Sequence, residues 1–222
     1  MGRTSLAKER RVQILEAFYR CISKHGLQNS TIKRIAQEAG VQPSILYHYF
    51  RDRDQMVEKL LKKVLDDLTA SYVSKTSGCI DPQTRFEKAI DFMYGPEMLD
   101  KQFANFFYNC LAEAQHKPKI RKSLRKSWQP GRDILSGLIL EIGKASGLSA
   151  AQARDFGDVI FAIQDGLEIQ RDIYGTRAPL KKMPQLIKDL FRVYVSKAEG
   201  SPEFAVLADN RRVDTFRYEE RY

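Results

Sequence analysis

The segment that most constrains how this chain can fold is residues 27–53, LQNSTIKRIAQEAGVQPSILYHYFRDR. Apolar residues recur at helical spacing on both sides of Gly40, which predicts two short helices joined by a tight turn. Glycine suits that turn because it has no Cβ to clash. The second helix is rich in Tyr and His, so packing the two apolar faces together leaves a polar, aromatic tip free. A helix-turn-helix needs this arrangement to place one helix in a DNA groove.

Residue types at the helix ends support the same interpretation. Ser30 or Thr31 can cap the first helix, because a side-chain hydroxyl accepts from its free backbone N–H groups. Pro43 suits the first turn of the second helix, where its missing N–H costs nothing. A longer helix is expected to begin near Asp52 or Asp54, whose charges favour a helix N-terminus. Four apolar side chains are expected to face inward: Val41, Ile45, Leu46 and Phe50.

The rest of the chain also has helical periodicity, and no segment has a convincing strand pattern, so we expect an all-α fold. A helix before this segment should end at Gly26, and one after it should cover about 54–74. Ser149 and Gln152 have capping-box spacing and should open a long helix. Further helices are expected from Asp81-Pro82 to Gly95-Pro96 and over about 96–115. Breaks are expected at Pro118 and at 129–131, followed by a helix that ends near Gly147 and a last helix after Pro184.

Composition narrows the class of protein. The chain has 43% hydrophobic residues, enough for a real core, but no apolar run of membrane-spanning length, so no membrane partner is expected. Three widely separated cysteines suggest reduced thiols in a cytoplasm. Residues 1–63 carry 13 Lys and Arg against 6 Asp and Glu, a net charge of +7. Residues 64–222 carry 24 against 22, a net charge of +2, so the N-terminal part favours a polyanion partner or has a solvated basic face.

The segment Gly26–Arg53 resembles the N-terminal DNA-binding domain of TetR-family (TetR/AcrR-like) transcriptional regulators. The resemblance covers about residues 8–68 and rests on Ser30-Thr31-Ile32, Ile35-Ala36, Ala39-Gly40-Val41 and Leu46-Tyr47-His48-Tyr49-Phe50. The family often has Ser, Gly and Thr where this chain has Gln42, Ser44 and Ile45, so the operator sequence is not predictable. The expected organisation is a DNA-binding domain (1–53), a connecting helix (54–74), a ligand-binding and dimerisation domain (75–198) and a charged tail (199–222).

Candidate DNA-binding residues follow from the motif and from side-chain chemistry. Gln42 can pair with adenine, Ser44 can bond several bases, and Pro43 can contact a thymine methyl. Thr31 and Lys33 suit a phosphate at a helix N-terminus. The remaining candidates extend beyond the turn or match family positions near the DNA backbone: Tyr47, His48, Tyr49, Arg51 and Arg53. Any single aromatic residue here could instead simply pack against its neighbours.

The resemblance implies that the C-terminal part binds a small effector and forms a homodimer that reads a double-stranded DNA operator. Aromatic and sulfur-containing side chains could line a cavity for a hydrophobic effector, with two polar groups to orient it: Phe92, Phe103, Phe106, Phe107, Cys110, Trp128, Gln164 and Glu168. Apolar stripes could form a four-helix dimer interface: Phe156, Val159, Ile160, Ile163, Leu167, Leu186, Ile187, Leu190 and Tyr194. Plain burial within one protomer is the alternative for both sets.

Three other possibilities stay open. Residues 116–126, HKPKIRKSLRK, carry six Lys and Arg and no acid, which suits a solvated helix face or a phosphate-bearing effector. The chain could be a helical enzyme or lipid-binding protein, or a helix-turn-helix regulator without a ligand pocket. Catalysis has little support, because no metal-ligand spacing, phosphate loop or nucleophile motif is present, and no cofactor or metal is expected.

Overall fold

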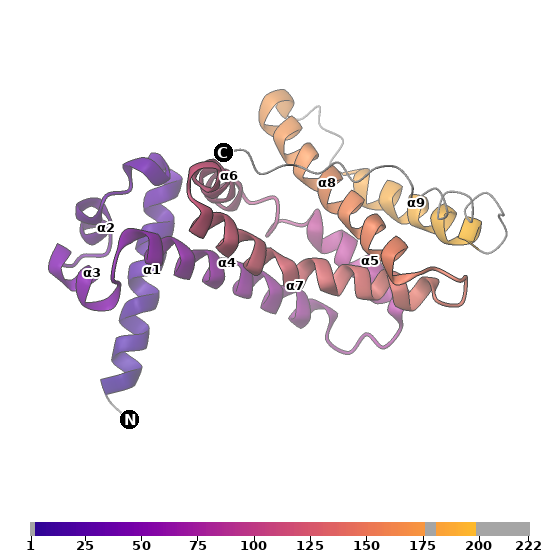
Figure 1. The fold of residues 1–222 in the computed structure, drawn as a ribbon, viewed down its shortest axis with the longest axis horizontal. Helices are drawn as coiled ribbons and strands as arrows, with labels where there is room; N and C mark the ends of the chain where they lie inside the picture. Colours follow the sequence, from indigo (N-terminus) through magenta and orange to yellow (C-terminus); the bar gives the residue numbers. More distant parts are fainter. Residues whose placement is uncertain (1–2, 176–180, 199–222) are drawn as a thin grey trace.

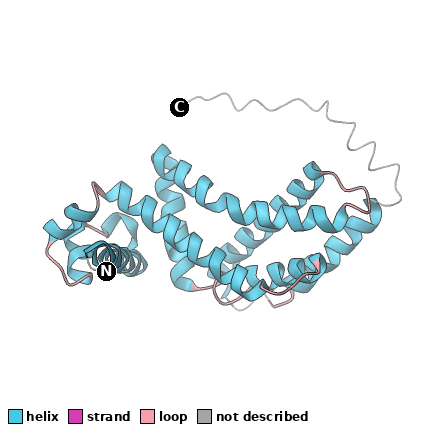
Figure 2. Cartoon of the chain, turned by 90° about the horizontal axis from the view of Figure 1, so that it is seen from below, coloured by secondary structure: helices cyan, strands magenta, loops and turns pink. Residues whose placement is uncertain are grey.

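A computed structural model describes residues 3–175 and 181–198, which form an elongated, two-part assembly of helices (Figure 1). No strand occurs in these residues, as Figure 2 shows from a second side, so the predicted all-α fold is confirmed. The helices are α1 (Arg3–Asn29), α2 (Ile32–Glu38), α3 (Pro43–Tyr49), α4 (Arg53–Thr76), α5 (Pro82–Met93), α6 (Lys101–His116), α7 (Pro118–Gly143), α8 (Ala150–Tyr174) and α9 (Met183–Ala198).

Helices α1, α2 and α3 lie at one end of the molecule and form the helix-turn-helix (Figure 1). Gly26 leaves the helical conformation with φ 75°, so regular α1 geometry ends where the sequence predicted. The Thr31 hydroxyl accepts from the Arg34 N–H and caps α2. Gly40 has φ 66°, a left-handed conformation that favours glycine, and it makes the turn into α3. Leu46 and Phe50 are buried as expected, but Ile45 is exposed, so the expectation for Ile45 is wrong.

Helix α4 joins the two parts of the molecule. The Asp52 carboxylate caps it by accepting from the Gln55 N–H at 2.7 Å. In its first half, Met56, Leu60 and Leu61 pack in the same core as Leu46 of α3. Its second half runs among the C-terminal helices and contacts α5 and α7. A change in the direction of α4 must therefore move the helix-turn-helix relative to the C-terminal helices.

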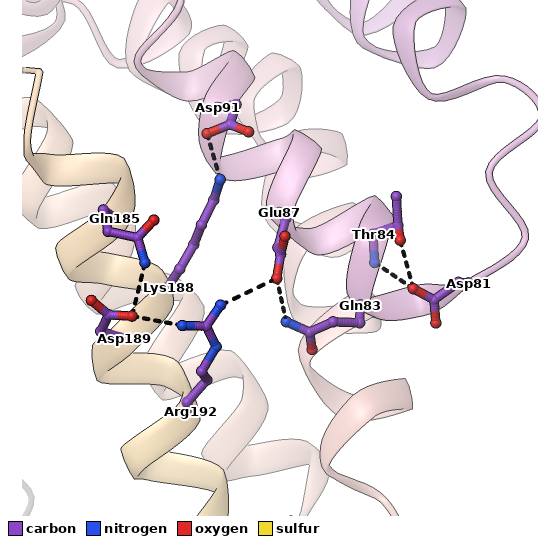
Figure 3. Close-up of polar contacts among 9 residues, drawn as sticks. All are labelled: Asp81, Gln83, Thr84, Glu87, Asp91, Gln185, Lys188, Asp189 and Arg192. Atoms are coloured by element: carbon purple, nitrogen blue, oxygen red, sulfur yellow. Dashed lines mark hydrogen bonds and ion pairs between the residues drawn. The ribbon is translucent and has the colours of Figure 1, made fainter.

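The C-terminal helices share a second core, which includes Phe86 of α5, Ile139 of α7, Phe156 of α8 and Phe191 of α9. Helix α8 begins with the predicted capping box, in which Ser149 and Gln152 bond each other's backbone N–H groups. Helix α9 lies along α5, and a row of polar contacts joins the two (Figure 3).

Two predicted boundaries in this part are wrong. Helix α7 runs without interruption through Pro130, although the sequence suggested a break there. Pro130 removes only the hydrogen bond to the Lys126 carbonyl, and both residues are exposed, so water can satisfy that oxygen. Helix α6 begins at Lys101, capped by Asp100, and not near residue 96. The charged tail 199–222 lies outside the described residues.

Candidate nucleic-acid interface and apolar cavity

The outer surface of α3 presents the side chains that the sequence proposed for DNA. Gln42, Pro43 and Ser44 are exposed at the start of the helix, and Tyr47 is 60% exposed. The His48 and Tyr49 rings meet edge to face with their centroids 5.1 Å apart. Buried Leu46 anchors the opposite side of α3 in the core, so the exposed side chains are held on a fixed helix.

The predicted phosphate-contacting residues separate into exposed and structural groups. Thr31 and Lys33 are exposed at the start of α2, where free backbone N–H groups favour an anion. Arg51 is exposed and forms an ion pair with Asp52, with 2.7 Å between Nε and Oδ2. Arg53 instead donates to the backbone carbonyls of Ser30 and Leu27. The Arg53 guanidinium therefore fixes the loop before α2, a role that the motif did not reveal.

An apolar cavity of about 90 Å³ lies between α4, α5, α7 and α8. Its lining is apolar apart from Thr69, Ser127 and the Tyr72 hydroxyl. Since ~10–15 Å³ of cavity volume holds one water, the cavity has room for a compact ligand. Two of the proposed ligand-binding residues, Phe92 and Trp128, line it. Sequence reasoning missed Tyr72 on α4 and Phe161 on α8, although Leu65, Leu68 and Tyr72 continue the apolar stripe of α4.

The other proposed ligand-binding aromatic residues lie outside this cavity. Phe103 and Phe107 stack on the lining residue Trp128 from outside the cavity, with ring centroids 6.3 and 4.9 Å from the Trp128 centroid. Phe106 and Cys110 are fully buried in the N-terminal core and do not reach the cavity. The reason is helical geometry: along α6, Phe106 and Cys110 face α1, whereas Phe103 and Phe107 face α7. Burial raises the pKa of the Cys110 thiol to about 12.

Gln164 and Glu168 form a buried polar pair on α8 and do not line the cavity, whose α8 wall is Phe161. The Gln164 amide donates to Glu168 Oε1 at 3.0 Å, and the two side chains are 2% and 3% exposed. Burial raises the pKa of the Glu168 carboxyl to about 7, although Arg171 partly opposes the shift. Gln164 Oε1 and the hydroxyls of Tyr94 and Tyr108 have no hydrogen-bond partner in the described chain. The amide oxygen can accept a hydrogen bond, and each tyrosine hydroxyl can donate or accept one.

The nine proposed dimer residues divide between two faces of α8 and α9. Four are buried in the protomer's own core instead, among side chains of α5, α7 and α9: Phe156, Ile160, Leu167 and Ile187. Ile163 and Tyr194 are half-buried against the same core. Val159, Leu186 and Leu190 are 47%, 54% and 48% exposed. The predicted interface on α8 and α9 therefore included residues of the core-facing side of these helices as well as residues of the exposed side.

The outward apolar face continues beyond the predicted residues. Ile169, Ile173 and Val193 are 49%, 67% and 51% exposed. Polar contacts hold α9 against α5, including Lys188 Nζ to Asp91 Oδ1 at 2.6 Å, as Figure 3 shows. These contacts fix which side of α9 is left outside.

The described residues offer neither a metal site nor a membrane-spanning helix. Among the described residues, no group of His, Cys, Asp and Glu could hold a metal ion. None of the described helices is both long enough and apolar enough to cross a membrane.

Comparison with known proteins identifies both parts of the chain. The family model for "Bacterial regulatory proteins, tetR family" matches residues 14–60. The model for "BetI-type transcriptional repressor, C-terminal" matches residues 82–194, which is half of the chain. The HTH-type transcriptional regulator BetI of Burkholderia mallei is 27% identical over 195 residues, covering 86% of this chain and 97% of the relative.

Solved structures with lower identity share the fold. A transcriptional regulator from Pseudomonas aeruginosa PAO1 has a TM-score of 0.77 at 18% identity, covering 86% of this chain and 93% of that one. A regulator from Saccharomonospora viridis in complex with choline has a TM-score of 0.70 at 21% identity, covering 83% and 96%. FadR from Bacillus subtilis in complex with stearoyl-CoA has a TM-score of 0.68 at 18% identity, covering 81% and 96%. The chain thus belongs to the TetR family of bacterial helix-turn-helix transcriptional regulators, with a C-terminal domain of the BetI repressor type.

Proposed function

We propose that this regulator is a repressor that leaves its operator when a compact hydrophobic effector enters the cavity between α4, α5, α7 and α8. The observation that carries the proposal is the double role of α4. Leu65, Leu68 and Tyr72 in its second half line the cavity, while Met56 and Leu60 in its first half pack under the helix-turn-helix. A ligand that moves α4 therefore changes the position of α3.

We propose Gln42, Ser44 and Tyr47 as base-reading residues and Thr31 and Lys33 as phosphate contacts. Their exposure on α3 and at the start of α2 supports this assignment. Base edges are read by side chains at the leading end of a recognition helix, whereas phosphate contacts fix its register. No catalytic role is proposed, and action on DNA implies a cytoplasmic location.

A homodimer is part of the proposal, because two recognition helices must enter major grooves about one helical turn apart. The exposed apolar residues of α8 and α9 are the proposed interface, with Val159, Ile169, Leu186, Leu190 and Val193 at its centre. A four-helix arrangement with the partner would remove this apolar area from water.

The effector is proposed to be compact and to carry a hydrogen-bond donor or a positive charge. The cavity volume of about 90 Å³ favours a compact ligand. Gln164 Oε1 has no hydrogen-bond partner in the described chain, and with the Glu168 carboxyl it lies on α8 beyond the wall residue Phe161, so the two favour a donor on a ligand that reaches them. Similarly folded regulators in complex with choline and with stearoyl-CoA support a small-molecule effector, but these two ligands differ greatly in size. Choline is the better match to the volume.

The test uses a variant that fills the cavity. Gly131 lines the cavity on α7, and a Cβ added there would have the Phe161 ring as its nearest neighbour, at 3.8 Å. Gly131→Leu should bind operator DNA as the parent does but should no longer be released by the probes. The matched control is Gly137→Leu, an exposed position on the same helix with nothing within 4 Å of the added Cβ.

The probes are choline, its neutral isostere 3,3-dimethylbutan-1-ol, and stearoyl-CoA, each titrated into the protein–DNA complex. Release of the parent and the Gly137 variant, but not of the Gly131 variant, would support the cavity as the effector site. Full release of the Gly131→Leu variant would disprove it. Release by both choline and the isostere would assign recognition to shape, whereas release by choline alone would assign it to charge.

A further inference from the structure

The start of α7 carries a basic surface that the helix-turn-helix does not explain. Residues 114–132 contain no Asp or Glu, and Lys119, Lys122, Arg125 and Lys126 are all exposed. Lys122, Arg125 and Lys126 make no hydrogen bond or ion pair with any described residue. A fully solvated helix face would more often intersperse acids with its lysines. We call Lys119, Lys122, Arg125 and Lys126 the α7 basic face.

This basic face is attached to the DNA-binding part of the molecule. Ile120, on the inner side of the same turns, is fully buried in the core that contains Leu46 and Phe50. Lys117 Nζ lies 3.3 Å from Asp54 Oδ1 in the first turn of α4. Figure 1 shows the α6–α7 junction beside α1, at the end of the C-terminal helices that is nearer to α2 and α3.

The spacing of the residues gives the surface one direction. Lys119, Lys122 and Lys126 are three and seven positions apart, so they lie on one side of the helix. Buried Ile120 and half-buried Leu124 occupy the opposite, core-facing side. Long lysine side chains on one exposed side can follow a row of phosphates without a fixed geometry, because an ammonium binds as a point charge.

We infer that the α7 basic face binds the phosphate backbone of the DNA, as a second contact in addition to α2 and α3. DNA is the partner that this family uses, and a row of exposed cations without acids complements a polyanion. Such a contact raises affinity for every DNA sequence and carries no sequence information. The face occupies the turns of α7 that directly precede the cavity-lining residues Ser127 and Trp128, so effector binding can also act on it.

The test measures how strongly DNA binding depends on salt. The variant is Lys122→Gln/Lys126→Gln, and the matched control is Lys144→Gln/Lys197→Gln. The control lysines are exposed and have no ion pair with a described residue. Lys144 directly follows α7 and Lys197 lies in the last turn of α9, and Figure 1 places both helix ends far from α3. Both variants lower the net charge by the same amount, so a general charge effect cancels.

The probe is a 30-base-pair duplex of arbitrary sequence, titrated between 50 and 200 mM salt by fluorescence anisotropy. Each lost phosphate contact lowers the slope of log affinity against log salt by about 0.9. Loss of two contacts should therefore reduce the magnitude of the slope by about 1.8. Between 50 and 200 mM salt, the variant should then lose about 12-fold less affinity than the parent loses. The control should keep the parent slope, and Lys122→Arg/Lys126→Arg should restore it.

Equal slopes for the test variant and the control, with both variants folded by circular dichroism, would overturn the inference and leave a solvated face. An unchanged slope with loss of release by stearoyl-CoA would also overturn it and would assign the face to a phosphate-bearing ligand. A reduced slope that Arg restores supports contact with DNA.

Discussion

Replacing Glu168 tests whether the buried polar pair on α8 is maintained at the expense of stability. The Glu168 carboxyl is 3% exposed, and its hydrogen bond comes from a neutral amide, that of Gln164. The nearest cation, Arg171, donates to the Leu99 carbonyl at 2.7 Å, so it does not neutralise Glu168 directly. A buried carboxylate without a cationic partner favours its protonated form, and the pKa of Glu168 rises to about 7.

The sign of the pH effect follows from proton linkage. Between the unfolded pKa, about 4.3, and the folded value near 7, the folded protein holds one more proton than the unfolded chain. The free energy of unfolding should therefore fall as pH rises through this window and level off above pH 7. At about 1.4 kcal/mol per pKa unit, the loss is at most about 3–4 kcal/mol.

Glu168→Gln keeps the size and the polar contact but cannot ionise. Its free energy of unfolding in urea should exceed that of the parent at pH 8 by about 1–3 kcal/mol and should differ little at pH 5. Protein concentration is held constant, because the proposed dimer would also contribute to stability. Asp155→Asn is the control: an exposed acid on the same helix, with no ion pair to a described residue. The same difference from the parent at pH 5 and pH 8 would refute the reasoning.

Four further outcomes follow from single substitutions. Gly143→Ala should cost about 1–3 kcal/mol in urea denaturation, because the new Cβ would lie 2.8 Å from Leu148 Cβ. At Gly137 an added Cβ would have no atom within 4 Å, so Gly137→Ala should instead raise the free energy of unfolding by about 0.5–1 kcal/mol. An equal effect of the two substitutions would contradict the close contact between Gly143 and Leu148. Tyr47→Ala should weaken operator binding without lowering the melting temperature, and unchanged affinity would remove Tyr47 from the contacts. Leu190→Glu should shift sedimentation toward the monomer, and an intact dimer would exclude Leu190 from the interface.

The helix-turn-helix was predictable because local signals decide it. Thr31, Gly40 and Asp52 act within a few residues of their own positions, through caps and a turn. The same local logic failed at Pro130. Its usual effect as a helix breaker was outweighed by the packing of α7 against four other helices, which the sequence around residue 130 does not contain.

The cavity was only partly predictable because its walls come from four helices that are distant in sequence. An aromatic cluster on α6 drew attention to Phe106, yet the direction of each side chain depends on where α1 and α7 lie. Arg53 shows a similar limit. Its motif position suggests DNA, but its guanidinium reaches Ser30 and Leu27, and only the folded loop brings those carbonyls within reach.

The size of the cavity bears on which state of the repressor the effector selects. Protein interiors are close-packed, so a ligand larger than about 90 Å³ needs α4, α5, α7 or α8 to move apart. A ligand shifts an equilibrium only by its difference in affinity between the two states, and moving it from 1:99 to 99:1 takes about 5.5 kcal/mol. The effector must therefore bind the released state more tightly than the DNA-binding state, and a compact ligand does so when its contacts with Leu68 and Tyr72 improve as α4 shifts. Displacement of Tyr72 and Leu68 by the ligand would move α4, which carries the change to the core under α3. A ligand that filled the narrow cavity without moving α4 would stabilise the protein and leave it on DNA.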